Sequence, residues 1–303
     1  MKKRRQLGAG LFLLLALALF STPSRLVSQI KDEVDKVFGT GRHDVDNAVE
    51  TGRNLIKMTK PMDFEEEHRL GRQVAARLAG NFGIWNDPNW TLYLNLVGRG
   101  LVPYSERADI KYRFAILKVD DINAYSTPAG YIFITRGMLK ELGSEAELAG
   151  VLAHEIAHVA KKHIVKEVQK SNLYKTGASQ AIRAATVDVE SQQLIEKVND
   201  QIFDLLINKG FSKQDEYDSD QTGTLNAWKM GYNPLGLRNF IATLQSQEKD
   251  QSPRMKRLLS THPAPENRLK ELDKFMAQNG LKPENRQDNK ERFQAFKAKH
   301  PIP

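Results

Sequence analysis

The spacing of apolar residues predicts a chain that is mostly helical. In residues 64–79, FEEEHRLGRQVAARLA, apolar side chains recur three and four positions apart behind an acidic first turn, which is typical of an amphipathic helix. Asp63 stands before this segment as its expected cap. Caps or early prolines mark the starts of further predicted helices at Pro88, Ser212, Pro234 and Pro265.

After residue 111 apolar residues alternate with polar ones instead of recurring three and four positions apart. YRFAILKV, residues 112–119, alternates apolar and polar positions and is rich in residues that favour strands. NAYST, 123–127, and YIFIT, 131–135, follow with a Pro-Ala-Gly turn between them. The pattern predicts two or three strands of a small sheet, and no strand–helix–strand rhythm indicates a doubly wound parallel sheet. The expected fold class is therefore α+β and predominantly helical.

The N-terminus has the pattern of an export signal. Four basic residues at 2–5 precede LGAGLFLLLALALF, residues 7–20, which carries no charge. These 14 residues fit the apolar region of a signal peptide better than a membrane span, which needs roughly 20. Because no clear cleavage site follows, residues 1–28 are predicted to be a signal peptide or a retained membrane anchor, with a helical arm over 29–60. Either form would place the chain in a bacterial periplasm or at a membrane facing it.

Charge and composition narrow the classes of function. The 303 residues carry a formal net charge of +8, and half of this excess lies in the basic cluster at 2–5. No basic stripe interleaved with aromatic residues is visible in the sequence, so no nucleic-acid partner is expected. The chain has no cysteine, which excludes disulfides, thiolate metal ligands and cysteine nucleophiles.

Three ionisable residues lie within an apolar helix. The segment VLAHEIAHVAKKH, 151–163, follows a capping-box pattern at 144–147 and is apolar on almost every side. His154, Glu155 and His158 fall within one arc of about 100°, and burying them together is costly unless a cation pairs with them. The i, i+4 spacing lets both imidazoles reach one ion, and Glu155 is turned toward its open side, where it can take a proton from water. This is the H-E-x-x-H pattern of zinc peptidases, and the alternative is a surface helix with a chance histidine pair.

A catalytic zinc site needs a third protein ligand. Position 164, where one related pattern has its third histidine, is isoleucine, and His163 beside it is expected to be solvated or to support a ligand from behind. Glu216 and Asp220 lie four positions apart on a predicted helix. Glu216 can bind the ion while Asp220 accepts the far N–H of a ligating histidine and fixes its tautomer. The alternative is an exposed acidic helix face.

With these segments together, the chain resembles the HtpX/BepA-type family of membrane-associated zinc metallopeptidases, which are relatives of the CAAX prenyl proteases. The resemblance spans residues 63–274, and the motifs ELAGVLAHEIAHVAKKH, DEYDSDQTG and THPAPENRL stand in the family's order. It implies a zincin-like fold with a small mixed sheet and an active-site helix, in a metallopeptidase domain over 61–276 followed by a polar tail over 277–303. The chain shows no tetratricopeptide domain like that of some members, so recognition through such repeats is not expected.

The resemblance also assigns metal ligands. It implies one Zn²⁺ per chain, bound by His154, His158 and Glu216. Glu155 would be the general base of the reaction, and Asp220 would support a ligand histidine from behind.

Further residues are assigned roles around the metal. Arg268 matches an arginine that pairs with the acidic helix. His262 matches a Thr-His-Pro histidine near the metal, which would assist catalysis or cover the zinc. Asn123, Ala124 and Tyr125 resemble the edge strand with which an extended substrate pairs.

The expected function is hydrolysis of peptide bonds in unfolded or misassembled cell-envelope proteins by a zinc-dependent endopeptidase. Its expected partners are an extended polypeptide substrate and envelope or outer-membrane assembly proteins, with membrane association through the N-terminus. Two alternatives stay open. One is a chaperone or assembly factor whose zinc site is closed by His262 and which cleaves little. The other is a metallohydrolase that acts on a non-peptide substrate in a compact polar pocket.

Overall fold

The computed structural model describes residues 61–171, 188–246 and 264–303, together with seven residues between these ranges. The predicted signal peptide or anchor and the helical arm lie outside the described residues, as does most of the loop between 247 and 263. No helix in the described ranges is both long and apolar enough to cross a membrane. The seven additional residues are Leu173, Tyr174, Ala178, Ala181, Ile182, Thr261 and His262.

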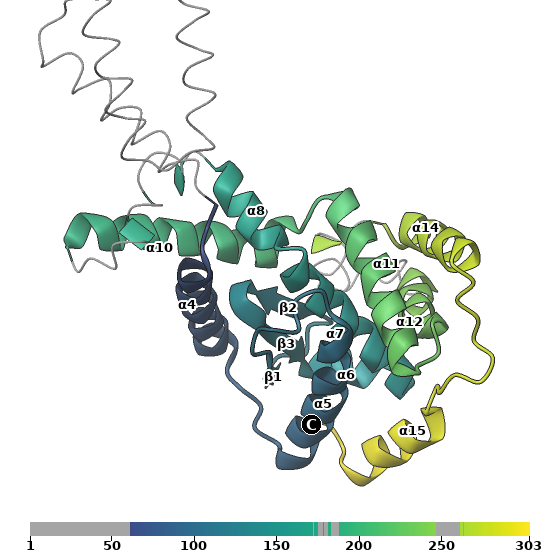
Figure 1. The fold of residues 1–303 in the computed structure, drawn as a ribbon. Coiled ribbons are helices and arrows are strands. Elements are labelled where there is room, and N and C mark those ends of the chain that lie inside the picture. The colour runs from purple at the N-terminus through teal and green to yellow at the C-terminus, as the bar shows by residue number, and fades with distance from the viewer. Residues whose placement is uncertain are drawn as a thin grey trace, which may run out of the picture. The chain divides into compact units, whose positions relative to one another are not determined.

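Helices form most of the ribbon in Figure 1. The predicted helices are confirmed as α4 (Phe64–Phe82), α5 (Pro88–Leu101), α7 (Glu145–Ala160), α11 (Lys213–Met230), α12 (Leu235–Ser246) and α14 (Pro265–Gln278). The other described helices are α6 (Arg136–Glu141), α8 (His163–Lys170), α10 (Val189–Asp204) and α15 (Lys290–Lys299). Short turns are η2 (Val102–Tyr104), η3 (Pro128–Gly130) and the π-helical η5 (Leu205–Lys209).

The sheet has three described strands in the order β1-β3-β2 and is mixed, as predicted. They are β1 (Arg113–Leu117), β2 (Ala124–Thr127) and β3 (Tyr131–Thr135). The first pairs parallel to β3 and the second antiparallel to it, so β2 is an edge strand among the strands that the structure describes.

Helix α7 is the centre of the core. Figure 1 shows it between the sheet and the pair α11 and α12, and contacts with β2, β3, α11 and α12 agree with that view. Its residues are buried on all sides, which explains why its sequence is apolar almost all the way round. Leu148, Leu152 and Ile156 pack with strand residues such as Ile132 and Ile134. A second apolar cluster lies against α4 on the other side of the sheet.

The start of α7 differs in detail from the predicted capping box. The Ser144 hydroxyl accepts a hydrogen bond from the Glu147 backbone N–H at 3.2 Å, as a helix cap should. The Glu147 carboxylate accepts instead from the Gly143 N–H at 2.7 Å, one residue before the cap. Only half of the reciprocal pattern therefore forms.

The C-terminal segment expected as a polar tail contains helix α15, which packs on the core. Phe293 is fully buried and contacts Trp90 edge-to-face, and Phe296 does the same one turn later. The Trp90 indole N–H donates to the His300 carbonyl at 2.8 Å. This segment is polar on average, but Phe293 and Phe296 lie on one face of α15 and pack the helix against the core.

Candidate metal centre

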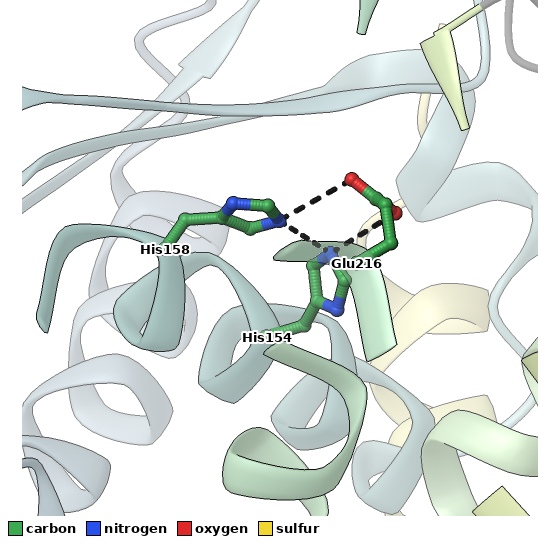
Figure 2. A group of neighbouring side chains, drawn as sticks. All are labelled: His154, His158 and Glu216. Carbon is green, nitrogen blue, oxygen red and sulfur yellow. Dashed lines mark hydrogen bonds and ion pairs between the residues drawn. The ribbon is translucent and has the colours of Figure 1, made fainter. Parts of the chain in front are cut away.

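Two histidines of α7 face each other across one helical turn (Figure 2). His154 and His158 are four residues apart, and their Nε2 atoms lie 3.0 Å from each other. Both residues are buried, at 4 % and 2 % exposed. Since α7 is packed on every side, both imidazoles are held within the protein rather than in solvent.

Glu216 on α11 completes a group of three donors (Figure 2). It is fully buried, with Oε1 3.4 Å from His158 Nε2 and Oε2 3.8 Å from His154 Nε2. Gly223 permits this approach of the two helices, because a Cβ there would lie 2.7 Å from the His154 backbone nitrogen. One donor atom from each of the three residues lies within 4.8 Å of the others.

This donor set fits a divalent cation. A tetrahedral zinc ion at ~2.0–2.1 Å from its ligands would separate neighbouring donor atoms by about 3.3 Å. The two Nε2 atoms lie 3.0 Å apart, and each has a different Glu216 oxygen near it, Oε1 at 3.4 Å from His158 and Oε2 at 3.8 Å from His154. Within the part of the chain that the structure describes, the buried Glu216 Oε1 has no hydrogen-bond partner. Two imidazoles and one carboxylate also leave a coordination position open, as in catalytic rather than structural zinc sites.

A buried ion pair supports His154 from behind. His154 Nδ1 lies 2.9 Å from Asp220 Oδ1. The Arg268 guanidinium donates twice to Asp220, from Nε at 2.8 Å and from Nη2 at 2.6 Å. Burial would raise the pKa of Asp220, but the charge and hydrogen bonds of Arg268 outweigh it and hold that pKa below its ordinary value. The ionised carboxylate can therefore accept the His154 N–H and leave Nε2 free for a metal.

A different group supports His158. Its Nδ1 lies 2.9 Å from Nδ1 of His163, which is buried at 1 % exposed. Burial, and then the nearby His158, lower the pKa of His163 to about 3, so this imidazole is neutral. The other nitrogen of His163 faces Asp215 Oδ1 at 3.4 Å. The suggestion that His163 is solvated is therefore wrong, because α8 turns the ring inward against His158.

Glu155 and His262 lie beside the donor group. Glu155 is buried at 4 % exposed and lines a cavity together with His154 and His262. His262 Nδ1 lies 2.7 Å from Glu216 Oε2, so this histidine contacts the carboxylate of a candidate ligand. Burial would raise the pKa of Glu216, but His262, His158 and Arg268 hold it well below its ordinary value.

Comparison with protein families identifies the family of the chain. Residues 89–276, which run from α5 to α14, match the family described as peptidase family M48. The chain belongs to this family. The resemblance inferred from the sequence motifs is thereby confirmed.

Relatives of this M48 chain carry protease names. The beta-barrel assembly-enhancing protease of Escherichia coli K12 is 26 % identical over 225 residues, which cover 69 % of this chain and 43 % of that protein. The mitochondrial metalloendopeptidase OMA1 of Schizosaccharomyces pombe is 24 % identical, covering 74 % and 64 %. The metalloprotease YcaL of E. coli K12 is 24 % identical, covering 76 % and 87 %. The chain thus spans less than half the length of the beta-barrel assembly-enhancing proteases that it matches.

The M48 match contains all of the candidate ligands and the groups that support them. The structure brings together His154, His158 and Glu216, with Asp220 and Arg268 directly behind them. Their convergence follows from the packing of α7, α11 and α14, which lie far apart in the sequence.

Asn123, Ala124 and Tyr125 are predicted to pair with substrate, but their main-chain N–H and C=O groups do not all point to the same side of the strand. The Thr135 N–H donates to the Asn123 carbonyl at 3.0 Å, so these two residues form a hydrogen-bonded pair between β2 and β3. Because such pairs alternate in an antiparallel ladder, the main chain of Tyr125 also faces β3, whereas that of Ala124 and Ser126 faces away. The Ala124 N–H is already bonded to the Asn123 side chain at 2.9 Å.

Sequence reasoning missed the contact between His163 and Asp215 in this M48 site. Asp215 is adjacent to Glu216 and therefore turned by about 100° from it, which is toward α8. In a continuous helix, a histidine five positions after His158 would be turned by about 140° from it and would not share its face. The feature of the sequence that marks this turn is the pair Lys161-Lys162, which lies between the two histidines. Lys162 adopts a left-handed backbone, φ 57°, which ends α7 and turns the chain into α8.

Proposed function

We propose that this chain is a zinc-dependent endopeptidase that binds one Zn²⁺ through His154, His158 and Glu216. The observation that supports this most directly is the convergence of three buried residues, each with one donor atom within 4.8 Å of the others, which is the ligand number of a catalytic zinc site. Membership of a peptidase family supports the reaction class. The names of the relatives, which are proteases and metalloendopeptidases, point the same way.

The residues around the site have separate tasks in peptide hydrolysis. A zinc ion bound there would lower the pKa of a water molecule toward about 7 and polarise the scissile carbonyl. Glu155 follows His154 on α7 and shares a cavity wall with it, so its carboxylate can accept the proton of the attacking water. The same carboxylate then returns that proton to the leaving amine. Asp220 and His163 hold the two imidazoles in orientation while this occurs.

The substrate that we propose is a polypeptide in extended conformation along β2. The carbonyl of Ala124 and the main chain of Ser126 face away from β3, the side on which another strand would pair. Since Ser126 is 1 % exposed, a substrate must displace the segments that cover this edge. Recognition through main-chain hydrogen bonds reads side chains loosely, which suits unfolded or misassembled proteins.

The cellular setting follows from the relatives and from the N-terminal segment. Since some relatives are named for enhancing β-barrel assembly, we propose that the substrates are cell-envelope proteins and that outer-membrane assembly proteins are partners. The export pattern in residues 1–28 would place the chain in the periplasm, either free or held at a membrane.

A substitution that separates metal binding from proton transfer tests this function. Glu155→Gln should keep one zinc per chain and lower the cleavage of an unfolded protein such as casein by about 10²–10⁴-fold. Glu291→Gln, which alters an exposed glutamate of α15, is the matched control and should cleave like the parent. Cleavage by Glu155→Gln at the parental rate would show that the base is another residue. A zinc-loaded parent that cleaves no unfolded substrate would refute the endopeptidase itself.

The contact of His262 with Glu216 favours a second candidate function. If His262 turned its ring to the ion as a fourth ligand, the site would be closed like a structural zinc site, and the chain would act as an assembly factor with little proteolysis. His262→Ala distinguishes the two. Faster cleavage by this variant supports a closed resting site, and slower cleavage supports catalytic assistance by His262.

A further inference from the structure

A cavity adjoins the candidate metal centre on the side of α12. Its polar end is formed by His154, Glu155, His262 and Arg268. The cavity has a volume of about 30 Å³, which is room for roughly two water molecules. The remaining walls come mainly from α6, α7 and α12 and are apolar: Met138, Val151, Leu237, Phe240, Ile241 and Leu244. Such a pocket beside polar reacting groups is suited to one small apolar side chain.

The position of Glu155 relates this cavity to the reaction. A group that returns a proton to the leaving amine must come within hydrogen-bond reach of that amine. Glu155 lines this cavity, whereas the described lining of a smaller cavity of about 10 Å³ contains His158 and Ser126 but not Glu155. The substrate residue that supplies the leaving amine therefore belongs at the larger cavity. The residue that supplies the carbonyl belongs toward the smaller one.

The edge strand links the two cavities and fits this order. Ala124 lines the larger cavity and Ser126 the smaller one, and these are the two residues of β2 whose main chain faces away from β3. A peptide paired along this edge would run from the Ser126 end to the Ala124 end, which is antiparallel to β2. Its cleaved bond would then lie between the two cavities, next to the paired histidines.

We propose that the cavity lined by α7 and α12 is a binding subsite for a small apolar side chain, that of the substrate residue whose amine leaves. The proposal rests on the endopeptidase function above and adds a side-chain preference to it. Side chains the size of those of alanine or valine would fill the space, while a benzyl group would collide with Phe240, the largest apolar residue of the wall. The wall cannot move back easily, because α12 is packed so closely on α7 that a Cβ at Gly150 would lie 2.6 Å from the Leu237 nitrogen.

Binding of zinc-anchored ligands tests this subsite without relying on turnover. The probes are succinyl hydroxamates, HONH–CO–CH2–CHR–CO–peptide, in which R takes the place of the side chain on the leaving-amine side and is methyl, isopropyl or benzyl, so that the metal fixes where that side chain lies. Titration calorimetry on the zinc-loaded full chain should show that the isopropyl compound binds about 15-fold more tightly than the methyl compound, since each of its two additional buried carbons contributes about fourfold. The benzyl compound should bind about tenfold more weakly than isopropyl.

Enlarging the cavity should reverse this order. Phe240→Ala is expected to bind the benzyl compound at least about tenfold more tightly than the parent does, and more tightly than it binds isopropyl. Leu92→Ala, which truncates an exposed residue of α5 outside this cavity, is the control and should keep the parental order. If Phe240→Ala does not fold, judged by its thermal transition, the smaller truncation Ile241→Val supplies the same comparison with an intermediate ligand, isobutyl.

The outcomes separate the subsite from the enzymatic function. Equal affinities across the series in the parent, or an unchanged order in a folded, zinc-loaded cavity variant, would overturn the subsite. Hydroxamates that bind in the expected order to a protein that cleaves no peptide would support the subsite and refute the endopeptidase alone. In a cleaving protein, products of casein digestion should begin mostly with alanine or valine, and a predominance of aromatic first residues would also overturn the proposal.

Discussion

Two arginine–aspartate pairs in this protein share their geometry and differ in burial, which permits a direct test of what holds the site together. Arg268 donates from Nε and Nη2 to Asp220 at 2.8 and 2.6 Å, and both residues are almost fully buried. Arg238 donates from the same two atoms to Asp273 at 2.8 and 3.1 Å, but these side chains are 33 % and 47 % exposed. The two arginines make the same pair of hydrogen bonds to their aspartate, but Arg268 also lies 3.8 Å from the Glu216 carboxylate, so the buried pair combines desolvation with a second charge contact.

Removal of each arginine should have unequal costs. Arg268→Met leaves Asp220 ionised and unpaired within the protein, and breaking a buried pair in this way costs about 3–5 kcal/mol of unfolding free energy. Arg238→Met breaks a pair whose partners water can solvate, so its cost should be about 0.2–1 kcal/mol. For a domain of this size the buried change corresponds to a fall in Tm of roughly 6–20 °C. The surface change corresponds to roughly 4 °C at most.

Urea denaturation of both variants measures these costs. The measurements should be made with a chelator present, because a bound metal would add its own binding free energy to the folded state. The double variant with Asp220→Asn and Arg268→Met should recover part of the loss, since it leaves no unpaired charge. If Arg268→Met and Arg238→Met lose the same stability within about 0.5 kcal/mol, burial of the pair does not control its contribution, and the account of its role given above is wrong.

Other expectations concern metal affinity and the C-terminal helix. Glu216→Ala should abolish stoichiometric zinc binding measured by elemental analysis, and the parent should lose thermal stability when a chelator removes its metal. His163→Ala should lower zinc affinity by about 10–100-fold in a competition titration with a chromogenic chelator, and an unchanged affinity would exclude support of His158 by His163. Phe293→Ala should cost about 3–5 kcal/mol in denaturation with urea, because it empties a fully buried position, whereas a mobile tail would give no change.

The sequence predicted best those features that local signals determine. Caps, early prolines and apolar spacing placed most of the helices, and the strands appeared where alternation replaced that spacing. The i, i+4 relations between His154 and His158, and between Glu216 and Asp220, are likewise properties of single helices. Each of these pairs could be assigned to one helix face without knowledge of the fold.

Features that depend on packing between elements were less accessible. The register between β2 and β3 determines which residues of β2 turn their main-chain groups outward. The sequence does not specify this register to one residue. The inward orientation of His163 depends on the turn at Lys162, where the chain leaves α7. The cavity beside Glu155 depends on how closely α12 packs on α7, so its size has no counterpart in any single motif.

The charges of the buried site explain why its parts belong together. Glu155, Glu216 and Asp220 are three buried carboxylates, and Arg268 supplies one compensating charge. With neutral imidazoles, full ionisation leaves two negative charges unbalanced, and isolated buried charges are very costly.

Protons and a metal ion are alternative ways to supply the missing positive charge. Burial would lower the pKa of His158, but the hydrogen bond and charge of Glu216 outweigh it and raise that pKa, so the imidazole attracts a proton when no ion is bound. A divalent ion supplies both missing charges at once and requires both imidazoles in their neutral form. In that form the proton of His154 lies on Nδ1, which faces Asp220 Oδ1 at 2.9 Å, and Nδ1 of His158 donates to Nδ1 of His163 at 2.9 Å. This assignment of protons leaves both Nε2 atoms free for the ion, which is the condition that a metal-binding site must meet.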